Sequence, residues 1–333
     1  MFSKKYIVVI FLFVLLVPAI DSVFNVSKLL VDEKSSENRA LTEKPEVDIN
    51  KLDYFPSKYD LYYNDHFMLR DLLINVYNHI KAICFNVSPI PDKAFIGKEN
   101  WLYMKDEELT YNGSNRFSDS DLVVVLKEFE RRKEYLKQRN CSMYIYIIPP
   151  KFTVYPEYVG KNIKRNDKPT QGGQVAEYFK KNSDIPVTYL LPALLKAKSA
   201  ENPLLFCTTD NHWSDYGAYI GYKEIISQLS YTYNQLKPLG ENDLEASDTI
   251  IDGGNIAMMM NMEKHYTERK HRLKPAKPCT QNGKKQNYPP PSGFPYPWDF
   301  ETQKDCSNKK LPKALVIHDS FMLKMIPFFC RKL

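Results

Sequence analysis

The stretch "CTTDNHWSDYGAYIGYKEI", residues 207–225, sets an acid, a histidine and a tryptophan directly before a segment of helical character. Asp210 and His212 are two residues apart, and on an extended backbone the side chains at i and i+2 point to the same side. We therefore expect the carboxylate and the imidazole to face one space. Ser214 is placed to cap a helix over 214–230, because its hydroxyl can accept an N–H of the first turn.

A second polar cluster ends the run "KALVIHDSF", residues 313–321, which predicts a continuous apolar strand. The stretch "PLLFCTTD", residues 203–210, predicts another. Strands alternate with helices along the chain, and several strands lack polar alternation. This pattern indicates an α/β fold with a mostly parallel sheet and helices on both faces. Ligands of open α/β sheets gather outside the carboxyl ends of the strands, where both clusters would lie.

The remaining predicted elements support this alternation. Helices are expected over 57–83, over 118–140 with Ser118 or Ser120 as the cap, and over 171–182. Apolar runs predict a turn and strand over 96–104 and strands within 142–151 and 186–191. Residues 274–312 are rich in Pro, Lys and Asn and predict a long surface excursion.

The two clusters together suggest nucleophilic catalysis. A serine needs a base within hydrogen-bond reach, and the base needs a partner that orients it. Ser320 would be the nucleophile at a strand-to-helix turn, His212 the base and Asp210 the group that fixes its tautomer. In the plainer structural interpretation, acids and serines after a strand cap the next helix. A metal site on Asp210, His212 and His318 is the rival chemistry, although no i, i+4 pair of histidines supports it.

The N-terminus predicts export. Lys4 and Lys5 precede an apolar run over 6–20, which is short for a membrane span and matches a secretory signal. Since no convincing cleavage site follows, residues 1–21 are either a signal peptide or an uncleaved signal anchor. Residues 22–56 form a tether and residues 57–333 the folded domain. Either alternative places the body outside the cytoplasm, in the periplasm or at the cell surface.

Composition excludes some partners and leaves others open. The net charge of +6 comes from Lys and Arg that are scattered along the 333 residues, which does not resemble a nucleic-acid footprint. The six cysteines form no close pair of the metal-ligand type. Cys279 and Cys306 flank a Pro-rich loop and could form a disulfide in an oxidising compartment.

Five stretches carry a resemblance to a known family, and they occur in the order found in that family. They are "ENRALTEKPEVD" with "YYNDHFMLRDLL", "IGKENWLYM", "IPPKFTVYPEYV", "TDNHWSDYGAY" and "VIHDSF". Together they lie within residues 37–329. With them the chain resembles the alginate O-acetyltransferase family of SGNH-hydrolase-like proteins, which includes the proteins called DHHW. The Asp-x-His-Trp and Asp-Ser-Phe blocks are the specific part of this likeness.

The resemblance implies an SGNH-hydrolase-like fold and a triad of Ser320, His212 and Asp210. It also implies that Ser320 takes an acetyl group from a donor and that His212 then activates a polysaccharide hydroxyl to receive it. In the family a membrane-bound O-acyltransferase hands over the acetyl group, and no diffusible cofactor is implied. Asn255 stands where the family has an Asp. Because the chain stops at Leu333, soon after Ser320, we expect the domain to be incomplete at its C-terminus.

Two other functions fit the same residues. A carbohydrate acetylesterase would share the acyl-serine and differ only in using water as the acceptor. A non-catalytic envelope protein would bind polysaccharide or act as a scaffold for an export complex, with its many tyrosines stacking on sugar rings. The transferase hypothesis depends on the family resemblance, because the residues themselves do not choose among these acceptors.

Overall fold

A computed structural model of the chain describes residues 4–24, 41–66, 70–160, 163–277, 280–286, 301–306 and 310–329. The α-helices are α1 (Lys4–Phe24), α2 (Phe55–His66), α3 (Arg70–His79), α4 (Glu107–Tyr111), α5 (Asp119–Lys137), α6 (Lys151–Val154), α7 (Gln171–Asn182), α8 (Leu191–Ala197), α9 (Asp215–Leu229), α10 (Asn255–Met259) and α11 (Met322–Phe329). A π-helical turn, η3 (Ile80–Cys84), continues α3. Short 3-10 helices are η2 (Ile49–Tyr54), η4 (Lys98–Asn100), η5 (Pro156–Tyr158) and η6 (Glu241–Asp243).

The strands are short and pair two by two. They are β1 (Ala94–Ile96), β2 (Leu102–Met104), β3 (Ile145–Ile147), β4 (Val187–Tyr189), β5 (Leu244–Ile251), β6 (Glu268–Pro275), β7 (Thr280–Gln286) and β8 (Glu301–Cys306). The β3–β4 pair is parallel, with Tyr146 opposite Thr188. The pairs β1–β2, β5–β6 and β7–β8 are antiparallel. The mostly parallel sheet expected from the sequence is therefore not confirmed within the described residues.

Two strands that the sequence predicts are absent from the described residues, so neither of them extends the two-stranded sheets. Residues 203–210 form only an isolated bridge, between Phe206 and Trp213. Residues 312–319 have no regular structure, and Leu315 and Ile317 are 81% and 93% exposed. A strand exists only where a neighbour supplies hydrogen bonds to its edge, and residues 312–319 pair with no described strand. The predicted strand over 313–321 was wrong for this reason.

Helices begin where the sequence supplies a cap. Ser118 and Asp121 form a capping box at the start of α5, in which each side chain accepts a hydrogen bond from the backbone N–H of the other residue. The Ser214 hydroxyl accepts the Gly217 N–H at the start of α9, as expected. Thr170 does the same for Gly173 at the start of α7. The helix predicted over 57–83 corresponds to α2, α3 and η3, and residues 67–69 between α2 and α3 lie outside the described residues.

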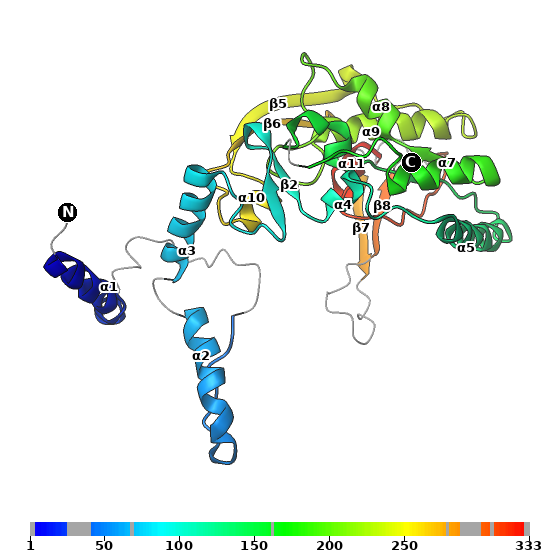
Figure 1. Ribbon diagram of the computed structural model, residues 1–333. Helices are drawn as coiled ribbons and strands as arrows, with labels where there is room; N and C mark the ends of the chain where they lie inside the picture. The colour runs from blue at the N-terminus through cyan, green and yellow to red at the C-terminus, as the bar shows by residue number, and fades with distance from the viewer. Residues whose placement is uncertain are drawn as a thin grey trace.

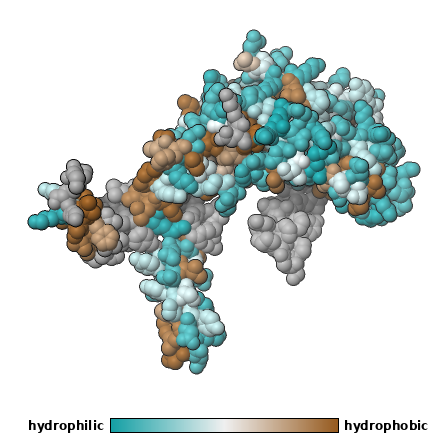
Figure 2. Space-filling view, viewed as in Figure 1, coloured by the Kyte–Doolittle hydropathy of each residue, from teal (hydrophilic) through white to brown (hydrophobic). Residues whose placement is uncertain are grey.

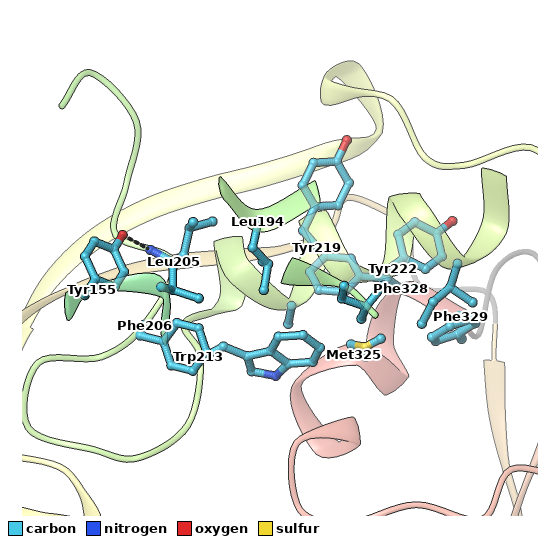
Figure 3. Packing of buried hydrophobic residues seen from close by; sticks show 14 of the residues in the cluster. Tyr155, Leu194, Leu205, Phe206, Trp213, Tyr219, Tyr222, Met325, Phe328 and Phe329 are labelled. Carbon is cyan, nitrogen blue, oxygen red and sulfur yellow. Dashed lines mark hydrogen bonds between the residues drawn. The ribbon is translucent and has the colours of Figure 1, made fainter. Parts of the chain in front are cut away.

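The core that carries the site lies between α9 and α11. Tyr222 and Ile226 of α9 are completely buried, and Met325 and Phe328 of α11 pack in the same cluster. Figure 3 shows Trp213 lying between Phe206 and Met325, below the helix that carries Tyr219 and Tyr222. Burial of side chains of this size contributes about 1.5–3 kcal/mol each, so the contact between α9 and α11 holds α11 on the domain.

The N-terminal elements stand apart from this body. Figure 1 shows α1 and α2 projecting from the part of the molecule that contains α4 to α11. The apolar side chains of residues 6–13 in α1 are more than half exposed, and Figure 2 shows them as a hydrophobic surface. Among the residues that the structure describes, no helix combines the length and the apolar character required to cross a membrane.

Candidate active site

Asp210, His212 and Ser320 form a continuous chain of hydrogen bonds. His212 Nδ1 lies 2.7 Å from Asp210 Oδ1, and His212 Nε2 lies 2.8 Å from Ser320 Oγ. In the tautomer that suits both contacts, Nδ1–H donates to the carboxylate and the serine hydroxyl donates to Nε2. The structure therefore brings together the three residues that the sequence singled out, although 108 positions separate His212 from Ser320.

The acid and the histidine meet through a bend and not through a strand. Residues 208–212 form consecutive bends, so the i, i+2 argument for an extended backbone does not apply. Instead, Asp210 Oδ1 accepts the backbone N–H of His212 at 3.0 Å as well as the ring Nδ1–H. A short acidic side chain that accepts the N–H two residues later is typical of an Asx-turn. The pairing was predicted correctly, but its backbone geometry was not.

Ser320 lies in the turn that begins α11. Asp319 accepts the N–H of Phe321 on its side chain at 3.0 Å and the N–H of Met322 on its carbonyl at 3.3 Å. Asp319 therefore has the capping role that the plainer interpretation gave to both residues of the pair. The Ser320 side chain does not cap the helix, because its hydroxyl meets His212.

Two further hydrogen bonds fasten this turn to the histidine loop. Trp213 Nε1–H donates to the carbonyl oxygen of Phe321, and Lys324 Nζ donates to the carbonyl oxygen of Trp213 at 2.7 Å. The ring of Phe321 lies 5.0 Å from that of His212, centroid to centroid, and 5.6 Å from that of Trp213. Trp213 is completely buried, and Phe321 packs against both it and His212.

The metal alternative finds no geometric support. His318 Nδ1 donates to the carbonyl oxygen of Asp319 at 2.6 Å, which leaves the ring outside the Asp210–His212 pair. In the parts of the chain that the structure describes, no group of three or more His, Cys, Asp or Glu side chains could hold a metal ion. His66 and His79 each contact a backbone carbonyl one helical turn earlier.

The carboxylate of Asp210 is kept ionised by its hydrogen bonds. Burial alone would raise the pKa of Asp210, but the hydrogen bonds from His212 and from the Asn255 N–H outweigh burial and hold the pKa well below its ordinary value. The Asn255 side chain contacts Asn211 at 3.5 Å. Gly254 fits closely here, because an added Cβ would lie 2.6 Å from the Cβ of Asp210.

Three charged residues near the site were missed by the sequence analysis. Lys151 is completely buried, and Glu268 is 9% exposed. Burial lowers the pKa of Lys151, and the negative charge of Glu107 opposes this effect. Burial raises the pKa of Glu107, whose Oε2 has no hydrogen-bond partner among the described residues. Lys151 belongs to one of the resembling blocks, but nothing in its local sequence distinguishes it from a surface lysine.

Cys279 lies outside the described residues, so its pairing with Cys306 stays a prediction. Cys84, Cys141 and Cys207 are free thiols. Cys207 is half-buried, and its Sγ lies 3.4 Å from Lys324 Nζ, beside the hydrogen bonds that hold the serine turn. This position makes Cys207 part of the packing around the site.

Comparison with known proteins places most of this domain in a known family. The model of a family described as "SGNH hydrolase-like domain, acetyltransferase AlgX" matches residues 94–286, which include Asp210 and His212 and end before Ser320. The probable alginate O-acetylase AlgJ of Azotobacter vinelandii is 25% identical over 187 residues, which cover 55% of this chain and 43% of that protein. The corresponding protein of Pseudomonas aeruginosa is 24% identical over 178 residues, 53% of this chain and 42% of that protein. The chain thus matches less than half the length of these relatives.

One solved structure supports a similar fold, and a second matches less of the chain. PatB1 of Bacillus cereus has a TM-score of 0.52 at 16% sequence identity, over 72% of this chain and 84% of that chain. The O-acetyltransferase domain of Pseudomonas putida AlgJ has a TM-score of 0.40 at 17% identity, over 56% of this chain and 67% of that chain. The family model covers more than half of the chain, and the similarity to PatB1 supports the same fold. The chain therefore belongs to the family of SGNH hydrolase-like domains described as acetyltransferase AlgX.

Proposed function

We propose that this protein is an exported, serine-dependent O-acetyltransferase that moves an acetyl group through an acyl-serine onto a polysaccharide. The observation that carries the proposal is the chain of hydrogen bonds from Asp210 through His212 to Ser320. An oriented imidazole beside a hydroxyl is the arrangement that turns serine into a nucleophile. The family and its alginate O-acetylase relatives support acetyl as the acyl group and a polysaccharide as the acceptor.

The first half-reaction transfers the acetyl group to the protein. Ser320 Oγ attacks the acetyl carbonyl carbon of the donor while its proton passes to His212 Nε2. The tetrahedral intermediate then expels the donor's oxygen or sulfur, which takes this proton from His212, and acetyl-Ser320 remains. Asp210 keeps the Nδ1–H of His212 in place and stabilises the positive charge that forms on the ring.

The second half-reaction returns Ser320 to its starting state. His212 Nε2 takes the proton of a sugar hydroxyl, whose oxygen attacks the acetyl carbon of acetyl-Ser320. The intermediate breaks its bond to Ser320 Oγ, and the proton on His212 returns to that oxygen. The backbone N–H of Ser320 makes no hydrogen bond with any described residue, and it is suited to donate to the oxyanion in both steps.

The donor and the location follow from the same proposal. A membrane-bound O-acyltransferase would hand over the acetyl group, and no diffusible cofactor takes part. Lys4 and Lys5, which begin helix α1 and precede its apolar run, support export to the periplasm or the cell surface. The exposed position of Ser320 is compatible with access by a large donor protein or a polymer.

The same exposure favours a second candidate, a carbohydrate acetylesterase. Water reaches an exposed acyl-serine freely, and hydrolysis needs no further binding site. The two activities differ only in the oxygen that attacks acetyl-Ser320. They are therefore distinguished by the product and not by the first half-reaction.

The test uses a chromogenic acetyl ester as donor and compares the protein with its Ser320→Ala variant. We expect the variant to lose turnover by on the order of 10³-fold or more, as for other triad serines. Ser247→Ala, which removes an exposed hydroxyl from β5, is the matched control and should keep full activity. An oligosaccharide that gains the mass of an acetyl group identifies the transferase, and free acetate alone identifies the esterase. Equal rates for wild type and Ser320→Ala, or no turnover in either, would favour a non-catalytic polysaccharide-binding or scaffold protein.

A further inference from the structure

The backbone of residues 207–210 runs between two buried side chains of opposite charge. On one side, Lys151 Nζ donates to the carbonyl oxygens of Cys207 at 3.2 Å and Thr208 at 3.1 Å. Lys151 Nζ also contacts the carbonyl oxygens of Asp210, at 2.7 Å, and Leu102. The buried ammonium thus ties the loop that carries Asp210 to strand β2.

On the other side, Glu268 accepts hydrogen bonds from the same loop. Its Oε2 lies 2.7 Å from the backbone N of Thr208, 3.2 Å from the backbone N of Thr209 and 2.8 Å from Thr208 Oγ1. Glu268 is the first residue of β6, so this carboxylate ties the loop to a second strand pair.

The two sets of contacts share two peptide groups. The carbonyl of Cys207 and the N–H of Thr208 belong to one planar peptide unit, and the carbonyl of Thr208 and the N–H of Thr209 belong to the next. In a trans peptide the C=O and N–H bonds point in opposite directions. Each unit therefore directs its oxygen to the ammonium of Lys151 and its hydrogen to the carboxylate of Glu268.

This arrangement explains how two charges are accommodated in the interior. A buried charge is costly unless hydrogen-bonding groups replace the water it loses. Here the peptide dipoles do so, and they are aligned between a positive and a negative charge. Rotation of either peptide plane would break contacts with both side chains. The plane orientations, and with them the path of the chain into Asp210, are thereby fixed.

Neither charged group reaches the reacting atoms directly. Within the described residues, the side chains of Lys151 and Glu268 make no hydrogen bond or ion pair with His212 or Ser320. Thr209 extends the same restraint, because its hydroxyl accepts the Gly254 N–H at 2.7 Å and its carbonyl accepts the Ile256 N–H at 3.1 Å.

We propose that Lys151 and Glu268 are a pair of positioning residues that hold two successive peptide planes so that the Asp210 carboxylate meets His212 Nδ1. This proposal deepens the proposed function and rests on it for its catalytic meaning, but the alignment it describes can be measured without acetyl transfer. The pair acts through the backbone and is not part of the chemistry.

The decisive readout is the proton signal of His212 Nδ1–H, which a short hydrogen bond to a carboxylate shifts far downfield in NMR spectra. In the Lys151→Met variant we expect this signal to disappear or move upfield in the folded protein. Labelling of Ser320 by phenylmethylsulfonyl fluoride should slow by about 10- to 100-fold, as expected for a small misplacement of the base. Lys198→Met is the matched control, because Lys198 Nζ also donates to a backbone carbonyl, that of Val154 at 2.7 Å, but away from the loop.

The proposal would be overturned if the Lys151→Met variant loses thermal stability but keeps both the downfield signal and the labelling rate. Lys151 would then stabilise the fold without positioning Asp210. If Lys151→Met does not fold, Glu268→Gln decides, because it removes the charge and keeps an acceptor oxygen. An upfield shift of its Nδ1–H signal supports the pair, and an unchanged signal refutes it. If the wild-type protein transfers no acetyl group but the variants show these shifts of the Nδ1–H signal, the proposed function is disproved and the positioning role of the pair still holds.

Discussion

Trp213 Nε1–H donates a hydrogen bond of 2.9 Å to the carbonyl oxygen of Phe321 and thereby joins the residue after the base to the residue after the nucleophile. Lys324 returns the contact, since its Nζ donates to the Trp213 carbonyl. These two bonds link segments more than a hundred residues apart directly beside the His212–Ser320 contact. The tryptophan of the Asp-x-His-Trp block therefore has a structural task that explains its place next to the histidine.

Replacing Trp213 by Phe should separate the base from the nucleophile. The variant loses the N–H donor and part of a completely buried side chain, so we expect the free energy of unfolding to fall by about 1–3 kcal/mol. Sulfonylation of Ser320 by phenylmethylsulfonyl fluoride, which uses the same activated hydroxyl, should slow by about 10- to 100-fold. Tyr219→Phe is the control, because it removes a buried donor to the Leu239 carbonyl in the same core. An equal loss of labelling in both variants would contradict the specific role of Trp213.

A methyl group at position 254 should displace the Asp210 carboxylate. The Cβ of Gly254→Ala would lie 2.6 Å from Asp210 Cβ, which is closer than real side chains approach. We expect a loss of about 1–3 kcal/mol in chemical denaturation and at least a 10-fold loss of esterase turnover. Gly240→Ala, where the nearest atom is 4.0 Å away, should change neither quantity. Full esterase activity in Gly254→Ala would show that a displacement of the Asp210 carboxylate does not affect turnover.

The stabilising contribution of Asp210 should be lost in acid. Its pKa is lowered in the folded protein, so the unfolded chain binds the proton first as the pH falls. The contribution is complete above about pH 4, near the ordinary pKa, and declines as the pH falls toward the lower folded-state value. The melting temperature of Asp210→Asn should therefore be well below that of wild type at pH 7, and the gap should narrow toward pH 3. A gap that is the same at both pH values would contradict this assignment.

Glu107 should show the opposite pH dependence. Burial raises its pKa above the ordinary value of 4.5, so the folded protein holds the proton where the unfolded chain releases it, and ionisation costs stability as the pH rises. Glu107→Gln carries no such cost. Its free energy of unfolding relative to wild type should increase by about 2 kcal/mol between pH 5 and pH 8, measured by urea denaturation. A relative stability that decreases over this range would contradict the raised pKa of Glu107.

Local features of the structure were predictable from the sequence, whereas features that need a distant partner were not. The caps at Ser118 and Ser214 depend on a few neighbouring residues, and both helices begin where they were expected. The strands over 203–210 and 313–321 were not found, because an apolar run does not reveal whether another strand pairs with it.

The candidate site shows the same division. Asp210 and His212 are near neighbours in the sequence, and Ser320 stood out by its position after an apolar run. Lys151 could not be identified, because its burial arises from contacts with residues about 50 positions away in both directions along the chain. The buried residues that hold the site in place can thus be identified only from the three-dimensional structure.

Ser320 is positioned by a helix and not by a strand of a sheet. Residues 313–320 are exposed along their whole length, and the turn at Ser320 is held by α11 through Met325 and Phe328 in the core. Local fraying of this short helix would move the Ser320 hydroxyl away from His212 and leave the Asp210–His212 hydrogen bond intact. Under the proposed function, the rate of acyl transfer would then depend on how firmly α11 packs on the core, without unfolding of the rest of the domain.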